Sequence, residues 1–138
     1  MIRVAINGYG RIGRSVLRAA YESKLQDQVK IVAINEPADN KTIAHLTRYD
    51  STHGRFLGEV NCDKNTLTVC GDSIAIVHQD DLDQLPWAAL KIDVVLECSG
   101  SFSDRNNAEK HLHSGAKRVL FSQPAESDVD ATIVYGYN

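Results

Sequence analysis

The stretch Ile2–Arg14 reads IRVAINGYGRIGR, and it decides the fold of this chain. Apolar Ile2, Val4 and Ile6 stand at every second position, which predicts a short buried strand. A glycine-rich turn with the spacing G-x-G-x-x-G follows, and residues 15–20 continue with the apolar periodicity of a helix. Strand, glycine turn and helix, in this order, form the context in which such a turn binds a dinucleotide. The alternative is a mere turn, because glycine-rich turns are common.

The three glycines have separate roles in the dinucleotide interpretation. Gly8 allows the tight turn, Gly10 lets the backbone approach a pyrophosphate, and Gly13 lets the helix pack closely on the strand. The helix N-terminus then offers unpaired N–H groups and a positive dipole end to the phosphates.

Length and composition limit the function classes. The 138 residues suffice for one domain with a core, and the net charge of −3 argues against nucleic acid as an obligate partner. The chain has neither a long apolar segment nor a signal-peptide pattern, so we expect no membrane and a cytoplasmic location. Cys62, Cys70 and Cys98 are odd in number and lack C-x-x-C spacing, which disfavours disulfides and zinc.

A second strand is predicted at Val29–Asn35, where the apolar run is typical of a parallel strand that is buried on both sides. Glu36 follows directly, 23 residues after Gly13 and close to the offset of about 20 expected for the acid that binds an adenosine ribose. A solvated loop acid is the alternative, and the place of Glu36 at the strand end favours binding. Pro37 ends the strand.

The middle of the chain contains weaker signals. A helix is expected within 40–49, and an exposed loop over 49–56 carries His53, a poor catalytic candidate without a visible orienting partner. Residues 59–78 predict a short antiparallel insertion with a hairpin turn at Gly71–Asp72. The acids of Asp80–Asp83 indicate a solvated loop, with a metal site as the remote alternative.

The last third returns to strands and helices. Trp87 lies in a short helical turn and is expected in the core. Strands are predicted at 93–98, 117–121 and 130–135, with a helix from 103–105 to Ser114 that Gly115 ends. His111 and His113 fall on different faces of that helix, so they are poor metal ligands.

The ligand crevice of an open α/β sheet lies beyond the carboxyl ends of its strands. Ser99 and Gly100 follow the strand at 93–98, so they are well placed to meet the cofactor that the glycine turn holds. Cys98 has no visible base partner and is expected to be structural rather than nucleophilic.

Several segments together resemble one family. NGYGRIGR, AINEP, YDSTHGRF, LECSGSF, GAKRVLFSQPA and VYGYN occur in the order and spacing of the glyceraldehyde-3-phosphate dehydrogenases. Glu36 in INEPAD, the LPW segment at 85–87 and FSQPAESDVDATIVYGYN resemble the branch of bacterial D-erythrose-4-phosphate dehydrogenases. That branch oxidises erythrose 4-phosphate to 4-phosphoerythronate with NAD, on the route to pyridoxal phosphate.

The resemblance implies a fold and a cofactor. We expect an α/β fold of the Rossmann type, a doubly wound and mostly parallel sheet with a short antiparallel insertion at about residues 59–78. The resemblance also implies NAD as cofactor and a homotetramer. The residues expected to contact NAD are Asn7, Gly8, Gly10, Arg11, Ile12, Gly13, Asn35, Glu36, Ser99, Gly100, Phe102 and Ser122. Asp80 stands where relatives often carry an arginine near the adenine.

The resemblance further implies where the chemistry lies. In this family a cysteine attacks the aldehyde to form a thiohemiacetal, a histidine acts as base, and hydrolysis or phosphorolysis releases the acyl group. That cysteine is expected about 16 positions beyond Asn138 by family spacing, so no catalytic residue is predicted within 1–138. A phosphorylating glyceraldehyde-3-phosphate dehydrogenase and a non-catalytic NAD-binding module are the alternatives.

Overall fold

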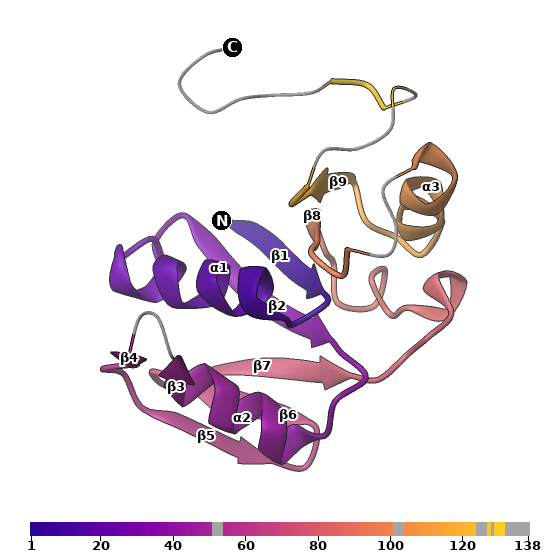
Figure 1. The fold of residues 1–138 in the computed structure, drawn as a ribbon. Coiled ribbons are helices and arrows are strands. Elements are labelled where there is room, and N and C mark those ends of the chain that lie inside the picture. The colour runs from indigo at the N-terminus through magenta and orange to yellow at the C-terminus, as the bar shows by residue number, and fades with distance from the viewer. Residues whose placement is uncertain (51–53, 101–103, 124–126, 128, 132–138) are drawn as a thin grey trace.

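Strands that are far apart in sequence form one sheet in the computed structural model, which describes residues 1–50, 54–100, 104–123, 127 and 129–131 (Figure 1). Within these residues the order of the strands is β5-β6-β7-β2-β1-β8-β9. Their bounds are β1 Ile2–Asn7, β2 Val29–Asn35, β5 Val60–Asp63, β6 Thr66–Val69, β7 Asp72–Val77, β8 Val94–Glu97 and β9 Arg118–Phe121.

The five strands from β7 to β9 are parallel, whereas β5, β6 and β7 pair in antiparallel fashion. The chain runs outward from β1 through β2 to β7, then returns to the other side of β1 with β8 and β9. The direction of winding therefore reverses between β1 and β8. This arrangement confirms the expected Rossmann-type fold, and such a reversal point is where open α/β sheets bind ligands.

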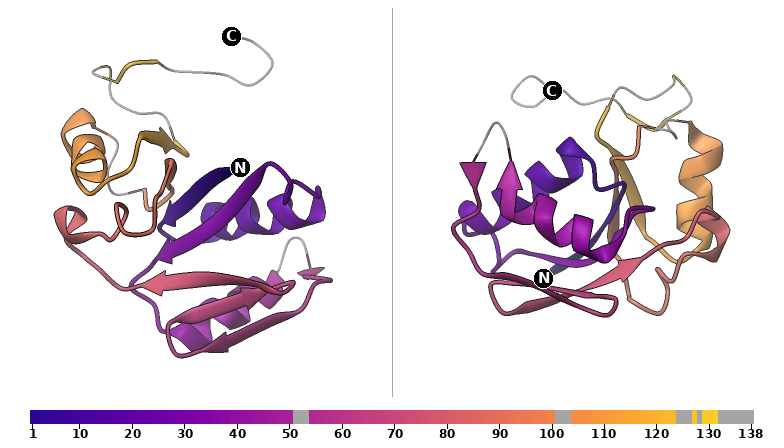
Figure 2. Two further views of the ribbon diagram at one scale, coloured as in Figure 1. Left: turned by 180° about the vertical axis from the view of Figure 1, so that it is seen from behind. Right: turned by 60° about the horizontal axis from the view of Figure 1, so that its bottom comes forward.

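Helices cover both faces of the sheet, as Figure 2 shows. On one face α1 (Arg11–Glu22) and α2 (Asn40–Arg48) pack on the sheet through a cluster that includes Leu17 and Ile43. The segment 82–92, which begins with the 3-10 helix Leu82–Gln84, lies on the other face together with α3 (Arg105–His113). Trp87 is fully buried there, as the sequence predicted.

One extra residue in β2 changes the register of the two central strands. Ile2 pairs with Val29 and Val4 with Ile31, but Ala5 pairs with Ala33, so Val32 has no partner in β1. Consecutive residues Val32 and Ala33 therefore both belong to the cluster under segment 82–92. As a result, the last residues of the two strands, Asn7 and Asn35, stand side by side.

The structure corrects three predicted details. The hairpin between β6 and β7 turns at Cys70–Gly71 rather than at Gly71–Asp72, because this tight turn places two consecutive residues at positive φ, 51° and 88°. Part of the loop at 49–56 forms a two-residue antiparallel pair, β3 (Tyr49–Asp50) with β4 (Gly54–Arg55).

The third correction concerns the expected strand at 130–135. Asp130 and Ala131 are not in a strand, and residues 132–135 lie outside the described part of the chain. The helix expected up to Ser114 is confirmed as α3, and Gly115 follows it at φ 117°. In the described ranges, no helix has the length and apolar character needed to cross a membrane.

Candidate functional site

The carboxyl ends of four neighbouring parallel strands form what we call the carboxyl edge. It consists of the final residues Asn35, Asn7, Glu97 and Phe121 of β2, β1, β8 and β9, which stand in one register row, together with the segments that leave these strands. The glycine turn, Glu36, Ser99, Gly100 and Ser122 all follow directly, so one edge brings together most of the predicted site.

The glycine turn is tightly enclosed on two sides. Gly8 has φ 93°, and a Cβ atom placed there would lie 2.4 Å from Ser99 Cα. At Gly13, a Cβ atom would lie 2.4 Å from the carbonyl oxygen of Gly8 and 3.1 Å from a methyl group of Ile6. These contacts agree with the tight turn predicted at Gly8 and the close helix–strand packing predicted at Gly13, and the structure adds the close approach of Gly8 to Ser99.

Gly10 differs from the other two glycines because its surroundings are open. A Cβ atom at Gly10 would meet nothing within 4 Å, and its backbone has an ordinary φ of −78°. Gly10 is also the N-cap of α1, and no side chain in the described part of the protein caps the helix there. The first N–H groups of α1, which include those of Arg11 and Ile12, are therefore left for an anion in a space without a side chain.

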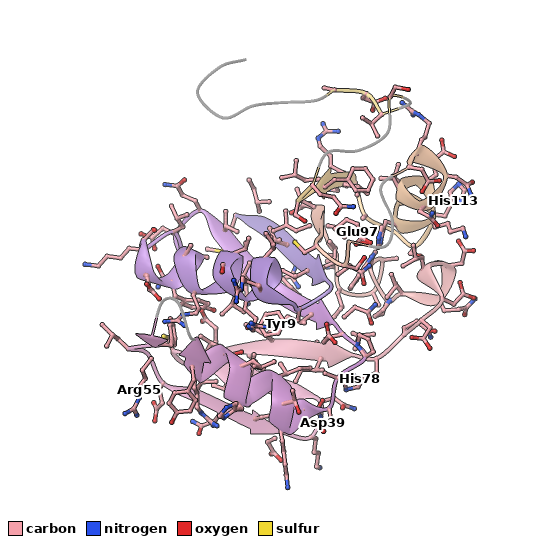
Figure 3. The ribbon with its side chains drawn as sticks, viewed as in Figure 1. Tyr9, Asp39, Arg55, His78, Glu97 and His113 are labelled. Atoms are coloured by element: carbon pink, nitrogen blue, oxygen red, sulfur yellow. The ribbon has the colours of Figure 1, made fainter. Side chains whose placement is uncertain are left out.

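Tyr9, between two of the glycines, anchors the turn to the helical layer. Its side chain is 2% exposed and lies between α1 and α2 (Figure 3). The Tyr9 hydroxyl is 2.7 Å from Thr47 Oγ1 on α2. Burial raises the pKa of Tyr9 to about 12. The turn is thus held by a buried aromatic side chain whose polar end is satisfied.

Glu36 lies at the carboxyl edge beside the turn. One carboxylate oxygen accepts the backbone N–H of Tyr9 at 2.8 Å, and the other accepts the N–H of Ala38 at 2.9 Å. Each oxygen retains a further lone pair that can accept a hydrogen bond from a hydroxyl group. The geometry therefore orients the carboxylate toward the glycine turn, as an acid that binds an adenosine ribose requires.

The segment after β7 borders the same acid. His78 Nδ1 lies 2.6 Å from the carbonyl oxygen of Glu36, and His78 Nε2 lies 2.8 Å from Asn40 Oδ1. Both ring nitrogens of His78 therefore face oxygen atoms. Asp80 is exposed close by in sequence. His78 is a site-lining residue that the sequence interpretation missed, and its only signal was its place at a strand end.

Asn7 and Asn35 are at the carboxyl edge, but their side chains are directed into the protein. They are 3% and 6% exposed, and Asn35 Nδ2 donates to Asn7 Oδ1 at 2.7 Å. Asn7 Nδ2 donates to both carboxylate oxygens of Glu97, at 3.0 and 2.7 Å. Their expected contact with NAD stays a prediction. The structure adds Glu97, which the sequence pattern assigned only to a strand.

The segments that follow β8 and β9 form the rest of the carboxyl edge. Ser99 Oγ donates to Glu97 at 2.9 Å, Gly100 has φ 75°, and the N–H of Ser122 donates to the Glu97 carbonyl at 3.0 Å. Burial raises the pKa of the Cys98 thiol, with Ser122 acting in the opposite sense. A thiol in that position is a poor nucleophile at neutral pH, which agrees with the structural role expected for Cys98.

Two predicted residues lie outside the described part of the chain, namely Phe102 and the weak candidate His53. Among the described residues, no group of three or more His, Cys, Asp or Glu side chains is placed to hold a metal ion, including those at 80–83.

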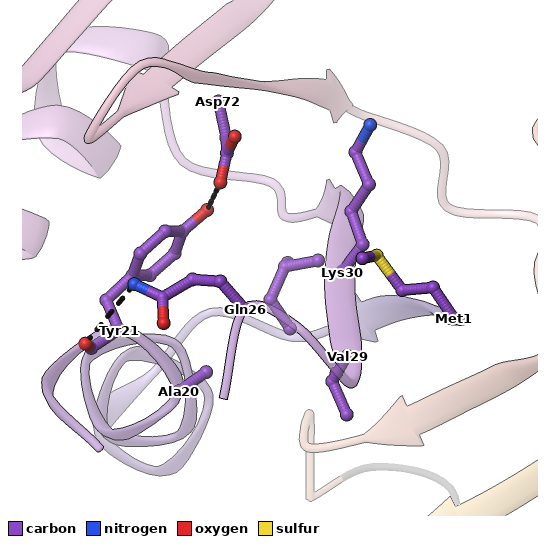
Figure 4. A pocket seen from close by; sticks show the side chains of 8 residues that line it. Met1, Ala20, Tyr21, Gln26, Val29, Lys30 and Asp72 are labelled. Atoms are coloured by element: carbon purple, nitrogen blue, oxygen red, sulfur yellow. Dashed lines mark hydrogen bonds between the residues drawn. The ribbon is translucent and has the colours of Figure 1, made fainter. Parts of the chain in front are cut away.

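A hollow of about 220 Å³ lies at the other end of the sheet, near the start of β2 and the end of α1 (Figure 4). The hydroxyl of Tyr21 donates to Asp72 Oδ2 at 2.9 Å at its border. The hollow lies at the opposite end of the strands from the glycine turn, so concavity and predicted chemistry do not coincide. Its lining residues are Met1, Ala20, Tyr21, Gln26, Val29, Lys30, Ile31 and Asp72.

The carboxyl edge fits a dinucleotide on two grounds, the open and uncapped helix start at Gly10 and the position of Glu36, whose carboxylate is fixed beside the turn. When bound, NAD supplies hydride transfer, and the residues above would hold it. A family model described as glyceraldehyde 3-phosphate dehydrogenase, NAD binding domain, matches residues 2–105. The chain therefore belongs to the glyceraldehyde 3-phosphate dehydrogenase family as an NAD-binding domain, and its cofactor is NAD.

Proposed function

We propose that this domain provides the NAD site of a D-erythrose-4-phosphate dehydrogenase. The enzyme would oxidise erythrose 4-phosphate to 4-phosphoerythronate, in the synthesis of pyridoxal phosphate. The observation that carries the NAD part is the carboxylate of Glu36, held by the N–H of Tyr9 beside the uncapped start of α1. The substrate part rests on the branch-like segments INEPAD, LPW and FSQPAESDVDATIVYGYN.

Glu36 supports NAD rather than NADP. A 2′-phosphate on the adenosine ribose would meet a carboxylate that two backbone N–H groups already hold in place. Like charges at such a partly screened site cost on the order of 1–3 kcal/mol.

The reaction proposed for the whole enzyme uses a cysteine beyond residue 138. Its thiolate would add to the aldehyde carbon to give a thiohemiacetal, and NAD held by this domain would supply the acceptor for the hydride of that carbon. A histidine would accept the hydroxyl proton, and water would release the acid from the resulting acyl-enzyme. We further propose that the enzyme is a cytoplasmic homotetramer, and that residues 1–138 alone bind NAD without dehydrogenase activity.

A rate assay on the two aldose phosphates tests the substrate assignment. We expect the enzyme that contains this domain to oxidise erythrose 4-phosphate faster than glyceraldehyde 3-phosphate, with no need for inorganic phosphate. Faster turnover of glyceraldehyde 3-phosphate with a strict phosphate requirement would instead identify a phosphorylating glyceraldehyde-3-phosphate dehydrogenase.

Purified residues 1–138 test the two remaining parts. Binding of NAD in a calorimetric titration, without turnover of either aldehyde, is the expected result. Measurable turnover would contradict the assignment of the chemistry to residues beyond 138. A complete enzyme that binds NAD but oxidises neither aldehyde would favour a non-catalytic NAD-binding module.

A further inference from the structure

Three strands of the carboxyl edge end in polar residues whose side chains form one buried chain, here called the polar ladder. Asn35, Asn7 and Glu97 occupy the same register row of β2, β1 and β8. They are 6%, 3% and 1% exposed. Three adjacent polar side chains at such burial require mutual hydrogen bonds, and the structure supplies them.

Glu97 at one end of the polar ladder, and the backbone of Gln79 at the other, fix the direction of its hydrogen bonds. A carboxylate can only accept, so Asn7 must present its NH₂ group to Glu97 and its carbonyl oxygen to Asn35. Asn35 then donates from Nδ2 to the carbonyl of Gln79 at 2.9 Å and accepts the N–H of Gln79 at 2.8 Å. The polar ladder thus connects the Glu97 carboxylate to the segment that follows β7, and its two ends favour the same direction of bonding.

A histidine on α3 approaches Glu97 from the other side. Trp87 Nε1 donates to His111 Nδ1 at 3.1 Å, so a neutral His111 ring carries its proton on Nε2. That nitrogen is fully buried, has no hydrogen-bond partner among the described residues and lies 3.7 Å from Glu97 Oε2. This distance is too long for a hydrogen bond. The Nε2–H of His111 nevertheless faces the same carboxylate that accepts hydrogen bonds from Asn7 and Ser99.

The polar ladder lies directly under the backbone that a dinucleotide would contact. Asn7 precedes Gly8, where a Cβ atom would lie 2.4 Å from Ser99 Cα, and Ser99 Oγ donates to Glu97 at 2.9 Å. The N–H of Cys98 also donates to the Asn7 carbonyl at 2.8 Å. A change in the Asn7–Glu97 pair would therefore alter the spacing between the glycine turn and the segment 97–100.

We propose that Glu97 is a positioning residue for NAD binding, which acts through Asn7 and Ser99 and touches no cofactor atom itself. This inference rests on the proposed function only in taking the carboxyl edge as the NAD site. The buried carboxylate, together with the backbone of Gln79, holds the polar ladder in one direction, and the ladder holds the glycine turn at its distance from the β8 end.

The test is Glu97→Gln in residues 1–138, with NAD affinity measured by calorimetry and folding by urea denaturation. Asn7 Nδ2 lies 3.0 and 2.7 Å from the two Glu97 oxygens. Whichever oxygen the NH₂ group of Gln replaces, it would therefore face the NH₂ group of Asn7. We expect the Kd for NAD to rise about 10-fold or more in the folded variant, because one of the two acceptor oxygens at Asn7 Nδ2 becomes a buried donor without an acceptor. Glu109→Gln on the exposed side of α3 is the matched control and should leave the Kd unchanged.

The double variant Asn7→Asp with Glu97→Gln separates positioning from a loss of charge. The amide introduced at position 97 can donate to the carboxylate introduced at position 7. That carboxylate can still accept from Asn35, so the rest of the polar ladder keeps its direction. We expect the double variant to recover part of the NAD affinity that Glu97→Gln loses, because one donor–acceptor pair between positions 7 and 97 is restored. The side-chain amide signals of Asn35 in a ¹⁵N correlation spectrum should move in the single variant and return in the double variant.

The outcomes distinguish this inference from the proposed function. If the unmodified domain fails to bind NAD, the assignment of the site fails first. A folded Glu97→Gln domain with unchanged affinity would overturn the positioning role. If the single variant does not fold, a double variant that also fails to fold, or folds without recovering NAD binding, would overturn it equally.

Discussion

The two ends of the parallel strands differ in how their polar side chains are buried and hydrogen-bonded. At the carboxyl edge, polar side chains are almost completely buried and hydrogen-bonded to one another, and no room for a Cβ atom is left between Gly8 and Ser99. At the opposite end, which we call the amino edge, Tyr21 and Asp72 border an open hollow of about 220 Å³. Despite this hollow, the N–H groups of a helix start and the fixed acid lie at the carboxyl edge.

The comparison shows that accessible backbone N–H groups identify the dinucleotide site better than the presence of a hollow does. A pyrophosphate needs N–H groups without a side chain in front of them, and Gly10 at the start of α1 provides this. Four substitutions, ordered by expected effect, can break or sharpen the contrast between the two edges.

Gly8→Ala should have the largest effect. Its Cβ would lie 2.4 Å from Ser99 Cα at φ 93°, so strain and overpacking should lower the free energy of unfolding by about 3 kcal/mol or more. Gly10→Ala is the matched control, with free space and an ordinary φ. It should change stability by less than about 1 kcal/mol but weaken NAD binding. Urea denaturation and NAD titration would measure both, and equal destabilisation by the two variants would contradict the different roles.

Glu36→Gln should come next and act on cofactor choice. We expect the unmodified domain to prefer NAD over NADP by about 1–3 kcal/mol, and the variant to lose most of that preference. Calorimetric titration with each cofactor measures the difference, and Glu109→Gln serves as a control at an exposed carboxylate. Equal dissociation constants for NAD and NADP in the unmodified domain would refute the role of Glu36.

Tyr21→Phe probes the amino edge. It removes the hydroxyl that donates to Asp72 and leaves the ring in place, so the free energy of unfolding should fall by about 1 kcal/mol. The NAD affinity should stay the same, because the hollow is not part of the cofactor site. A change in NAD affinity at equal folding would show that the two edges are coupled.

Asp93→Asn should have the smallest effect, a loss of stability above about pH 4 that disappears in acid. The N–H of Arg3 and then Lys117 lower the pKa of Asp93 at the amino edge. Its contribution to stability is therefore fully present above the unfolded pKa near 4 and is lost as pH falls through the lower folded pKa. The variant should flatten the decline of unfolding free energy below about pH 4 in urea titrations. An unchanged slope would contradict the ion pair and hydrogen bond as the cause.

The local elements could be predicted where chain neighbours alone set them. The buried strands at β1 and β2, the glycine turn and the end of α3 at Gly115 follow from periodicity and backbone freedom. The hairpin turn was misplaced by one residue, because Cys70 adopts a φ of 51° that a non-glycine residue rarely takes.

The residues of the candidate site could be predicted as a set, but their partners could not. The sequence by itself determined the strand–turn–helix order, the glycine spacing and an acid after β2, since these depend on local chain geometry. Only the tertiary structure decided that Asn7 stands beside Asn35. Without the extra residue Val32, the offset of 27 between Ile2 and Val29 would place Asn7 beside Ile34. Tertiary packing also brings Glu97 and His111 together. They are 14 residues apart in the chain and meet in the interior because α3 packs on the sheet.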